Sequence, residues 1–232
     1  MGKERTESSD KAQPRKNFTP DGKEIIQILA QLEELEADAL TKLTSFIDKK
    51  GALFVDVGTA DGGSAFVIAT QAKVVGGVCI TIDPYWENRE SRNNFLDLMA
   101  DSWEVRGHLF SMIMPSQLAS QFFPNKSIDF LFIDGDHRYS EVKADLTVWL
   151  PKMKPDSLLC GHDCERKYSD MTEEEQRGID AALERDDFGG FHSGVIRALY
   201  DVLGDNYETA AETRVWFTRI FWEDEILNQP DK

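Results

Sequence analysis

Apolar residues follow two different patterns along this chain, and the change falls near residue 51. Residues 1–20 are polar and contain two prolines, which predicts a flexible tail. From about Lys23 to Lys49, apolar residues recur mostly at spacings of three and four, which predicts an N-terminal helix within residues 21–50. We expect its apolar stripe to cover a sheet or a neighbouring subunit.

Beyond residue 51, short apolar runs alternate with helical stretches. Runs bounded by Gly, Pro, Asp or Asn and mostly apolar throughout are typical of parallel strands buried on both faces. The alternation predicts an α/β fold with a doubly wound, mostly parallel sheet. The predicted strands are Leu53–Val57, Val78–Ile82, Leu109–Met114, Ile128–Ile133 and Ser157–Cys160, and the helices between them are Ser64–Ala72, Arg89–Asp101, Ser116–Phe122 and Ser140–Lys152.

The last third of the chain is more polar. Thr172–Asp186 has the pattern of an exposed acidic helix, and Gly194–Leu203 that of a second helix. Tyr207–Phe221, with β-prone residues around Thr213–Val215, predicts a terminal antiparallel hairpin. We find no internal repeat and expect one domain over residues 51–226.

Composition narrows the function classes. The chain has 26 basic and 42 acidic side chains, a net charge of −16, which disfavours nucleic acids and anionic membranes because both attract cations. No apolar run approaches the roughly 20 residues of a membrane span, and the first residues lack the apolar segment of a signal peptide. Three cysteines suit a reducing compartment. We therefore expect a cytoplasmic enzyme.

A glycine-rich loop follows the first predicted strand. Glycines such as Gly58 allow a ligand close to the backbone, and the N-terminus of the next helix favours an anionic group. Ser64 is placed to cap that helix or to bind the ligand. Asp56 could meet an ammonium group, and Ala60 would crowd a pyrophosphate, so both favour an amino-acid-like ligand over a dinucleotide.

The next two strand ends suit a nucleoside. Asp83 ends the second strand, where a carboxylate can accept both hydroxyls of a ribose. Tyr85 or Trp86 could stack on a base, and either could equally belong to the core or the rim. Ser116 follows the third strand, where adenine is often contacted, and helix capping would explain it as well.

The most specific signal is a pair of acidic strand ends. The fourth strand runs into Asp134-Gly-Asp-His137, and the fifth ends in Gly-His162-Asp163. Adjacent parallel strands lie about 4.8 Å apart, so Asp134 and Asp163 can converge on Mg²⁺, Mn²⁺ or Ca²⁺. His162 would be a third ligand or a partner of one, and His137 could be a general base.

Two alternatives remain for this region. The charged groups could form only helix caps and a salt-bridged rim. Cys160, His162 and Cys164 could bind zinc, but no second Cys/His pair completes a tetrahedral set. His192, which follows the pair Gly189-Gly190, could lie on a mobile flap or serve as a cap.

Together these motifs resemble the small class I (Rossmann-like) S-adenosylmethionine-dependent methyltransferases grouped with macrocin-type sugar O-methyltransferases and cephalosporin-hydroxylase-like proteins. The resemblance covers roughly residues 51–221. It implies a seven-stranded sheet of the Rossmann-like kind. The segments that carry it are Asp56-Val-Gly-Thr-Ala-Asp-Gly-Gly-Ser64, Ile-Asp83-Pro, Ile-Asp134-Gly-Asp-His137-Arg-Tyr, Gly-His162-Asp163 and His192-Ser-Gly-Val195.

By position, the resemblance implies that Gly58, Asp61 or Ser64 line the methionine end of the cofactor and that Asp83 holds its ribose. It makes Asp134 and Asp163 metal ligands and His137 the catalytic base, and Asp134 would also border the cofactor. His162 stands where such enzymes carry an acidic ligand, which leaves the identity of the metal open.

The implied activity is metal-assisted O-methylation of a small hydroxylated acceptor, such as a sugar or natural-product hydroxyl. A nonenzymatic protein that binds the same cofactor and an NAD-dependent enzyme are the alternatives; Asp56 and Ala60 argue against the second. The apolar N-terminal helix is compatible with a homodimer.

Overall fold

The computed structural model describes residues 34–86, 88–185, 187 and 189–221. Its strands form one seven-stranded sheet in the order β3-β2-β1-β4-β5-β7-β6. Strands β1 to β5 are parallel, whereas β7 runs antiparallel to both β5 and β6. The doubly wound, mostly parallel sheet with a terminal hairpin is therefore confirmed. The strands are β1 (Leu53–Val57), β2 (Val78–Ile82), β3 (Leu109–Met112), β4 (Ile128–Ile133), β5 (Met153–Gly161), β6 (Glu208–Thr209) and β7 (Trp216–Ile220).

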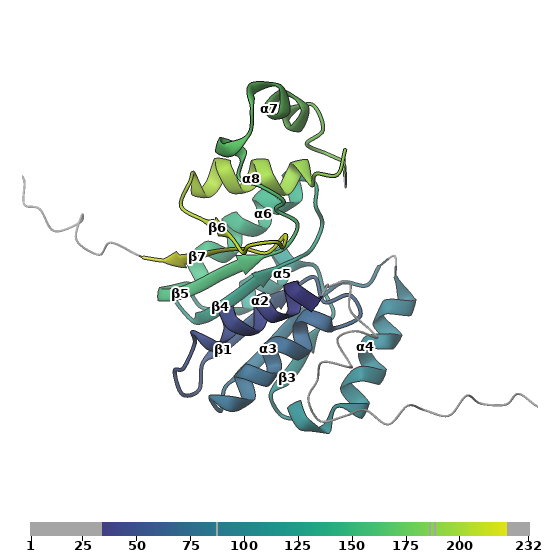
Figure 1. The fold of residues 1–232 in the computed structure, drawn as a ribbon. Helices are drawn as coiled ribbons and strands as arrows, with labels where there is room; N and C mark the ends of the chain where they lie inside the picture. The colour runs from purple at the N-terminus through teal and green to yellow at the C-terminus, as the bar shows by residue number, and fades with distance from the viewer. Residues whose placement is uncertain (1–33, 87, 186, 188, 222–232) are drawn as a thin grey trace, which may run out of the picture.

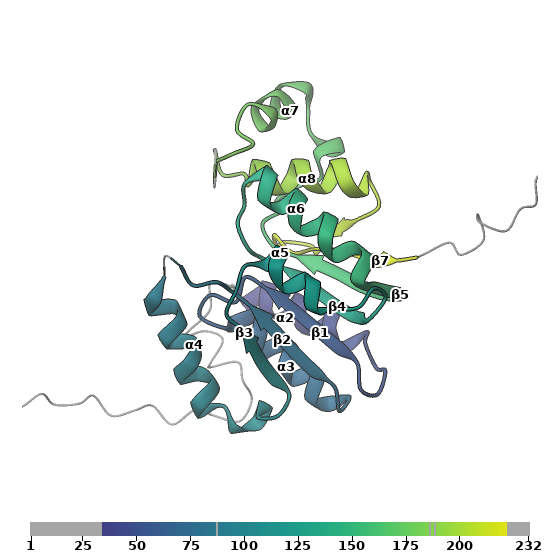
Figure 2. The same cartoon turned by 180° about the vertical axis from the view of Figure 1, so that it is seen from behind.

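Helices cover both faces of this sheet (Figures 1 and 2). One face carries α2 (Glu34–Ser45), α3 (Gly63–Val74) and α4 (Arg89–Asp101), and the other carries α5 (Ser116–Ala119), α6 (Tyr139–Trp149) and α8 (Ser193–Leu203). The short helix α7 (Glu173–Asp180) packs on α8. Single 3-10 turns lie at Trp103–Val105, Ser120–Phe122, Leu150–Lys152 and Tyr168–Asp170.

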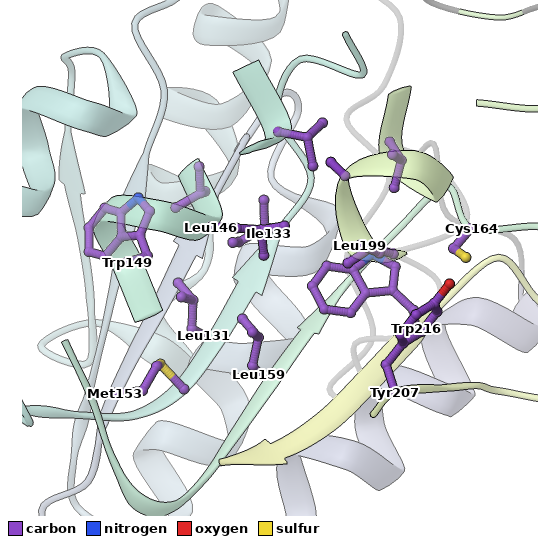
Figure 3. Close-up of a cluster of buried hydrophobic side chains, with 14 of the residues drawn as sticks. Leu131, Ile133, Leu146, Trp149, Met153, Leu159, Cys164, Leu199, Tyr207 and Trp216 are labelled. Carbon is purple, nitrogen blue, oxygen red and sulfur yellow. The ribbon is translucent and has the colours of Figure 1, made fainter. Parts of the chain in front are cut away.

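Strand β4 shows why the sequence specifies two helical layers. All six of its residues are buried. Phe130 and Phe132 point into the core beneath α2 and α3, while Leu131 and Ile133 point into the core beneath α6 and α8. Figure 3 shows the core beneath α6 and α8, where Trp216 of β7 packs with Leu131 and Ile133. A strand that is apolar on both faces is stable only between two layers.

Several element ends differ from the predicted ones. Strand β3 stops at Met112 rather than Met114, because the chain bends there and leaves Ile113 exposed. Strand β5 begins at Met153 rather than Ser157, since an irregularity in its pairing with β4 accommodates Pro155. Helix α7 ends at Asp180 rather than Asp186 because the carbonyl of Leu183 turns to accept the first amide of α6.

The N-terminal helix is described from Glu34 and ends at Ser45, four residues before the predicted Lys49. The predicted tail over residues 1–20 and the first part of that helix lie outside the described residues.

The β-prone residues Thr213–Val215 form the connection between β6 and β7 rather than a strand. Within the described part of the chain, no helix is long and apolar enough to cross a bilayer.

Candidate active site

The carboxyl ends of β1, β2, β4 and β5 border a cavity of about 760 Å³. Open α/β sheets place their ligands at this edge. Many of the residues predicted from the strand ends lie on its wall. They are Gly58, Asp83, Ser116, Asp134, His137, His162 and Asp163, together with Tyr85, Trp86 and His192. The cavity therefore joins two predicted parts of the site. The nucleoside edge is formed by Gly58 and Asp83, and the charged cluster is formed by Asp134, His137, His162 and Asp163.

Gly58 must be a glycine because the backbone of Asp134, just after β4, lies against it. Its φ is +89°, in the left-handed region, and a Cβ atom here would lie 1.8 Å from the carbonyl oxygen of Asp134. The first loop can thus lie directly on the end of β4, and the amide of Asp134 donates to the carbonyl of Val57 at 2.7 Å. This close contact between two backbone segments explains why the sequence has a glycine at this position.

Asp83 fixes the loops on both sides of it. Its Oδ2 accepts the amide of Ala60 at 3.0 Å, and its Oδ1 accepts the amide of Tyr85 at 2.7 Å. The hydroxyl of Tyr85 donates to the carbonyl of Ala60 at 3.1 Å. Tyr85 is thereby buried, whereas Trp86 is 75% exposed at the rim of the cavity.

Three predicted cofactor residues do not line the cavity. Asp56 is fully buried in β1, where its Oδ2 accepts the Thr81 hydroxyl at 3.0 Å and burial raises its pKa to about 7. Ser64 is buried in the first turn of α3 and does not cap the helix; the N-cap is Gly62. Asp61 accepts the side-chain amide of Asn94 at 3.2 Å. These residues support the loop from beneath or outside.

Ser116, which lines the cavity, is hydrogen-bonded to a buried tryptophan of α6. Its hydroxyl accepts the indole N–H of Trp149 at 2.8 Å. The neighbouring Gln117 donates to Oδ1 of Asp145 at 2.9 Å, and burial raises the pKa of Asp145 to about 7. Both Gln117 and Asp145 line the cavity, and neither was singled out from the sequence.

Asp134, His162 and Asp163 converge as the sequence predicts. Nδ1 of His162 lies 3.2 Å from Oδ1 of Asp163 and 3.7 Å from Oδ1 of Asp134. One ligand atom from each of the three lies within 4.8 Å of the others, so the group could hold a metal ion. His162 and Asp163 are buried, whereas the Asp134 side chain keeps 22% of its surface exposed toward the cavity.

The electrostatics of this cluster follow from burial and from close opposite charges. Burial raises the pKa of Asp134 to about 6. Burial acts to raise the pKa of Asp163 too, but hydrogen bonds from His137 and His162 hold it well below its usual range. Burial acts to lower the pKa of His162, and the carboxylates of Asp163 and Glu36 raise it instead to about 10.

His137 and His192 lie side by side at the cavity wall. Nε2 of His137 is 2.9 Å from Oδ2 of Asp163, and Nδ1 of His192 is 2.6 Å from Oε1 of Glu165. The two rings meet edge to face with their centroids 4.7 Å apart. Gly194 permits this approach, since a Cβ atom there would lie 2.2 Å from the carbonyl oxygen of His137.

Two members of the cluster were missed from the sequence. Glu36 of α2 places Oε1 2.9 Å from Nε2 of His162, and Arg214 places Nη1 2.8 Å from Oδ1 of Asp163. They come from opposite ends of the chain and also contact each other at 3.3 Å. The helical periodicity counts Leu35 in the buried stripe and leaves Glu36 outside it, whereas the structure buries Glu36 and leaves Leu35 51% exposed. It also gives no sign that this glutamate meets a histidine more than 120 residues away.

The zinc alternative finds no support in the geometry. Cys160 and Cys164 are buried in the two different apolar cores, and burial raises the pKa of both thiols. Neither joins a group of potential metal ligands among the described residues.

Known proteins resemble this chain in sequence and in fold. Residues 55–164 match the family model of a methyltransferase domain. Over 121 residues the chain is 31% identical to an uncharacterized protein of Sinorhizobium fredii; the match covers 48% of this chain and 13% of the relative. This chain therefore spans only a small part of that relative's length.

Solved structures share the fold at low identity. An O-methyltransferase from Bacillus cereus in complex with SAH has a TM-score of 0.60 at 13% identity, covering 89% of this chain and 94% of that one. A SAM-dependent O-methyltransferase from Thermotoga maritima has a TM-score of 0.57 at 13% identity, covering 89% and 73%. The comparisons thus agree with the resemblance inferred from the motifs: this chain has the Rossmann-like methyltransferase fold, and residues 55–164 match the model of a methyltransferase domain.

Proposed function

We propose that this chain catalyses the S-adenosylmethionine-dependent O-methylation of a small hydroxylated acceptor. One observation carries the proposal. A single cavity is bordered by Gly58 and Asp83 at the ends of β1 and β2, and by the charged cluster at the ends of β4 and β5. An edge suited to a nucleoside therefore adjoins groups that can take up the proton of a hydroxyl.

The nucleoside edge fits an adenosyl amino acid. Each oxygen of Asp83 accepts one backbone amide and has a further lone pair for a ribose hydroxyl. The cavity of about 760 Å³ lies within the roughly 300–1,000 Å³ typical of small-molecule sites. The Asp134 carboxylate borders the same space and is suited to an ammonium group.

His137 is the residue we propose as the base. Asp163 faces its Nε2, and a carboxylate partner orients an imidazole and stabilises the imidazolium that forms when it takes a proton. When bound, S-adenosylmethionine supplies an electrophilic methyl group. The protein's part is to hold the acceptor oxygen in line with that methyl group and to remove its proton.

A divalent cation fits the donor set beside His137. Asp134, His162 and Asp163 supply two carboxylates and one imidazole nitrogen that face a common point. Such an ion would lower the pKa of a hydroxyl bound to it. Mg²⁺, Mn²⁺ and Ca²⁺ are the candidates among hard cations.

The acceptor belongs to the proposal as well. The resemblance to sugar O-methyltransferases and the proposed pairing of a base with a cation favour a sugar or natural-product hydroxyl. The net charge of −16 argues against a nucleic-acid substrate. We propose a small-molecule partner and a cytoplasmic enzyme, with a homodimer as a compatible assembly.

The test is transfer of isotope-labelled methyl groups from S-adenosylmethionine to a panel of sugars, macrolides and catechols, with and without a chelator. Labelled product that disappears with chelation and returns with added cation is the expected result. Binding of S-adenosylhomocysteine without product from any acceptor would favour the nonenzymatic alternative. Binding of NAD in place of S-adenosylhomocysteine would overturn the proposal.

A further inference from the structure

His162 occupies an unusual position within the charged cluster, because carboxylates face both edges of its ring. Nδ1 faces Asp163 and Asp134, at 3.2 and 3.7 Å, on the side of the cavity. Nε2 faces Glu36 on the opposite side, at 2.9 Å. The side chains of His162 and Glu36 are only 5% and 4% exposed. The pair is therefore buried behind the proposed metal ligands, away from solvent.

The chain reaches this arrangement through helix α2. The buried face of α2 packs on α3 with Leu40 and Leu43 in the apolar core, and Glu36 is one turn before Leu40 on that same face. In that position the glutamate is buried and its carboxyl is directed at His162, at the end of β5. Burying its carboxyl is costly unless polar or charged groups face it, and here Nε2 of His162 and the guanidinium of Arg214 do so.

A carboxylate behind a histidine has a known effect on the ring. It keeps the proton on the ring nitrogen that it contacts and fixes the orientation of the ring. The other ring nitrogen is then free to donate its lone pair to a metal. The contact of Glu36 with Nε2 is short, although it is not aligned as a linear hydrogen bond. An imidazole nitrogen among the ligands suits Mn²⁺, Fe²⁺ and later transition metals, whereas Mg²⁺ requires oxygen ligands in a strict octahedron.

We propose that Glu36 is a positioning residue that presents Nδ1 of His162 to the metal, and that the resulting centre selects a transition-metal ion such as Mn²⁺ over Mg²⁺. The inference rests on the metal site of the proposed function. It adds a residue from the N-terminal helix to that site and names the class of ion the site takes.

A purely structural salt bridge is the competing explanation. Arg214 contacts both Glu36 and Asp163, so the four groups could simply neutralise one another. Loss of Glu36 would then lower the stability of the fold but leave the relative affinity for two metal ions unchanged. Ion selectivity is therefore the readout that separates a positioning role from a structural one.

The experiment is calorimetric titration of the chelator-treated chain, residues 1–232, with MnCl₂ and, separately, MgCl₂. We expect the wild type to bind Mn²⁺ at least 10-fold more tightly than Mg²⁺. Glu36→Gln should weaken Mn²⁺ binding by about 10–100-fold, the usual cost of losing such a partner, and Mg²⁺ binding by less, so that its preference for Mn²⁺ shrinks. Glu34→Gln, an exposed change on the same helix, is the matched control and should bind as the wild type does.

A double variant, His162→Asp with Glu36→Gln, creates an all-oxygen ligand set without placing the new carboxylate against Glu36. We expect its preference for Mn²⁺ over Mg²⁺ to shrink, and a thermal melt of each variant shows that it is folded. Equal affinities of the wild type for the two ions, no Mn²⁺ binding by the wild type, or wild-type Mn²⁺ binding by Glu36→Gln would each overturn the inference. Titration of the same samples with S-adenosylhomocysteine reports separately on the proposed function, since cofactor binding does not depend on which ion binds.

Discussion

Gly58 and the carbonyl oxygen of Asp134 are so close that a Cβ atom on Gly58 would lie 1.8 Å from that oxygen. The first loop and the end of β4 therefore form one surface. This contact holds the loop at the proposed nucleoside edge against the end of β4. The proposed metal ligand Asp134 and the proposed base His137 follow that strand.

Gly58→Ala should consequently be far more damaging than an ordinary glycine substitution. Both a positive φ and a steric clash oppose the methyl group. Gly76 is a matched control, because its φ is +64° but the space around it is open. Urea unfolding should show a loss of about 1–2 kcal/mol for Gly76→Ala from the backbone alone, and a clearly larger loss for Gly58→Ala. Similar losses in the two variants would mean that the contact with Asp134 is unimportant.

Asp83→Asn should weaken binding of S-adenosylhomocysteine. The amide replaces one carboxylate oxygen with a donor, which would face the backbone N–H of Ala60 or Tyr85, and it removes the negative charge that would accept the ribose hydroxyls. We expect at least about a 10-fold rise in Kd, or about 1.4 kcal/mol. Asp61→Asn should leave Kd unchanged, because Asp61 does not line the cavity. Equal effects at the two positions would argue against the placement of the ribose on Asp83.

His137→Gln should lower the rate of methyl transfer by about 10²–10⁴-fold, the range for loss of a general base. Binding of S-adenosylhomocysteine should be unaffected, so kcat falls and cofactor affinity does not. His108→Gln is the control, since His108 contacts the carbonyl of Gly77 at the start of β2, away from the cavity. A full rate in His137→Gln would remove this residue from the role of base.

Asp129→Asn should destabilise the protein in a pH-dependent way. Burial acts to raise the pKa of Asp129, but Lys154, the amide of Leu53 and Lys49 together lower it. A lowered pKa in the folded state gives stability that is present above the unfolded pKa of about 3.9 and is lost as the pH falls through the folded value. Thermal melts should therefore show a deficit of about 1–3 kcal/mol at pH 7 that shrinks below about pH 4. A deficit of constant size would contradict the lowered pKa.

The parallel core of the fold could be predicted because its strands are buried on both faces. Strands β1, β2 and β4 have their predicted bounds, since each is a short, mostly apolar run bounded by polar or turn-forming residues. The ends of β3 and β5 were placed wrongly because local features decide them. An exposed bend follows Met112, and an irregular stretch in β5 tolerates Pro155.

The candidate site was predictable only where it follows from strand ends. Asp134, His162 and Asp163 each follow an apolar run, so the parallel sheet brings them together. Glu36 and Arg214 could not be found in this way, because their meeting depends on how α2 and the β6–β7 hairpin pack over the end of β5. Asp56 lies in β1 just before the glycine-rich loop, but its burial beneath that loop has no sequence signal.

The most direct test of the central claim is a crystal structure of this chain with S-adenosylhomocysteine and Mn²⁺. We predict the ribose hydroxyls on the Asp83 carboxylate, the cofactor sulfur directed toward His137, and the metal between Asp134, His162 and Asp163. A nucleoside bound outside this cavity, or one whose sulfur points away from the cluster at the ends of β4 and β5, would contradict the account.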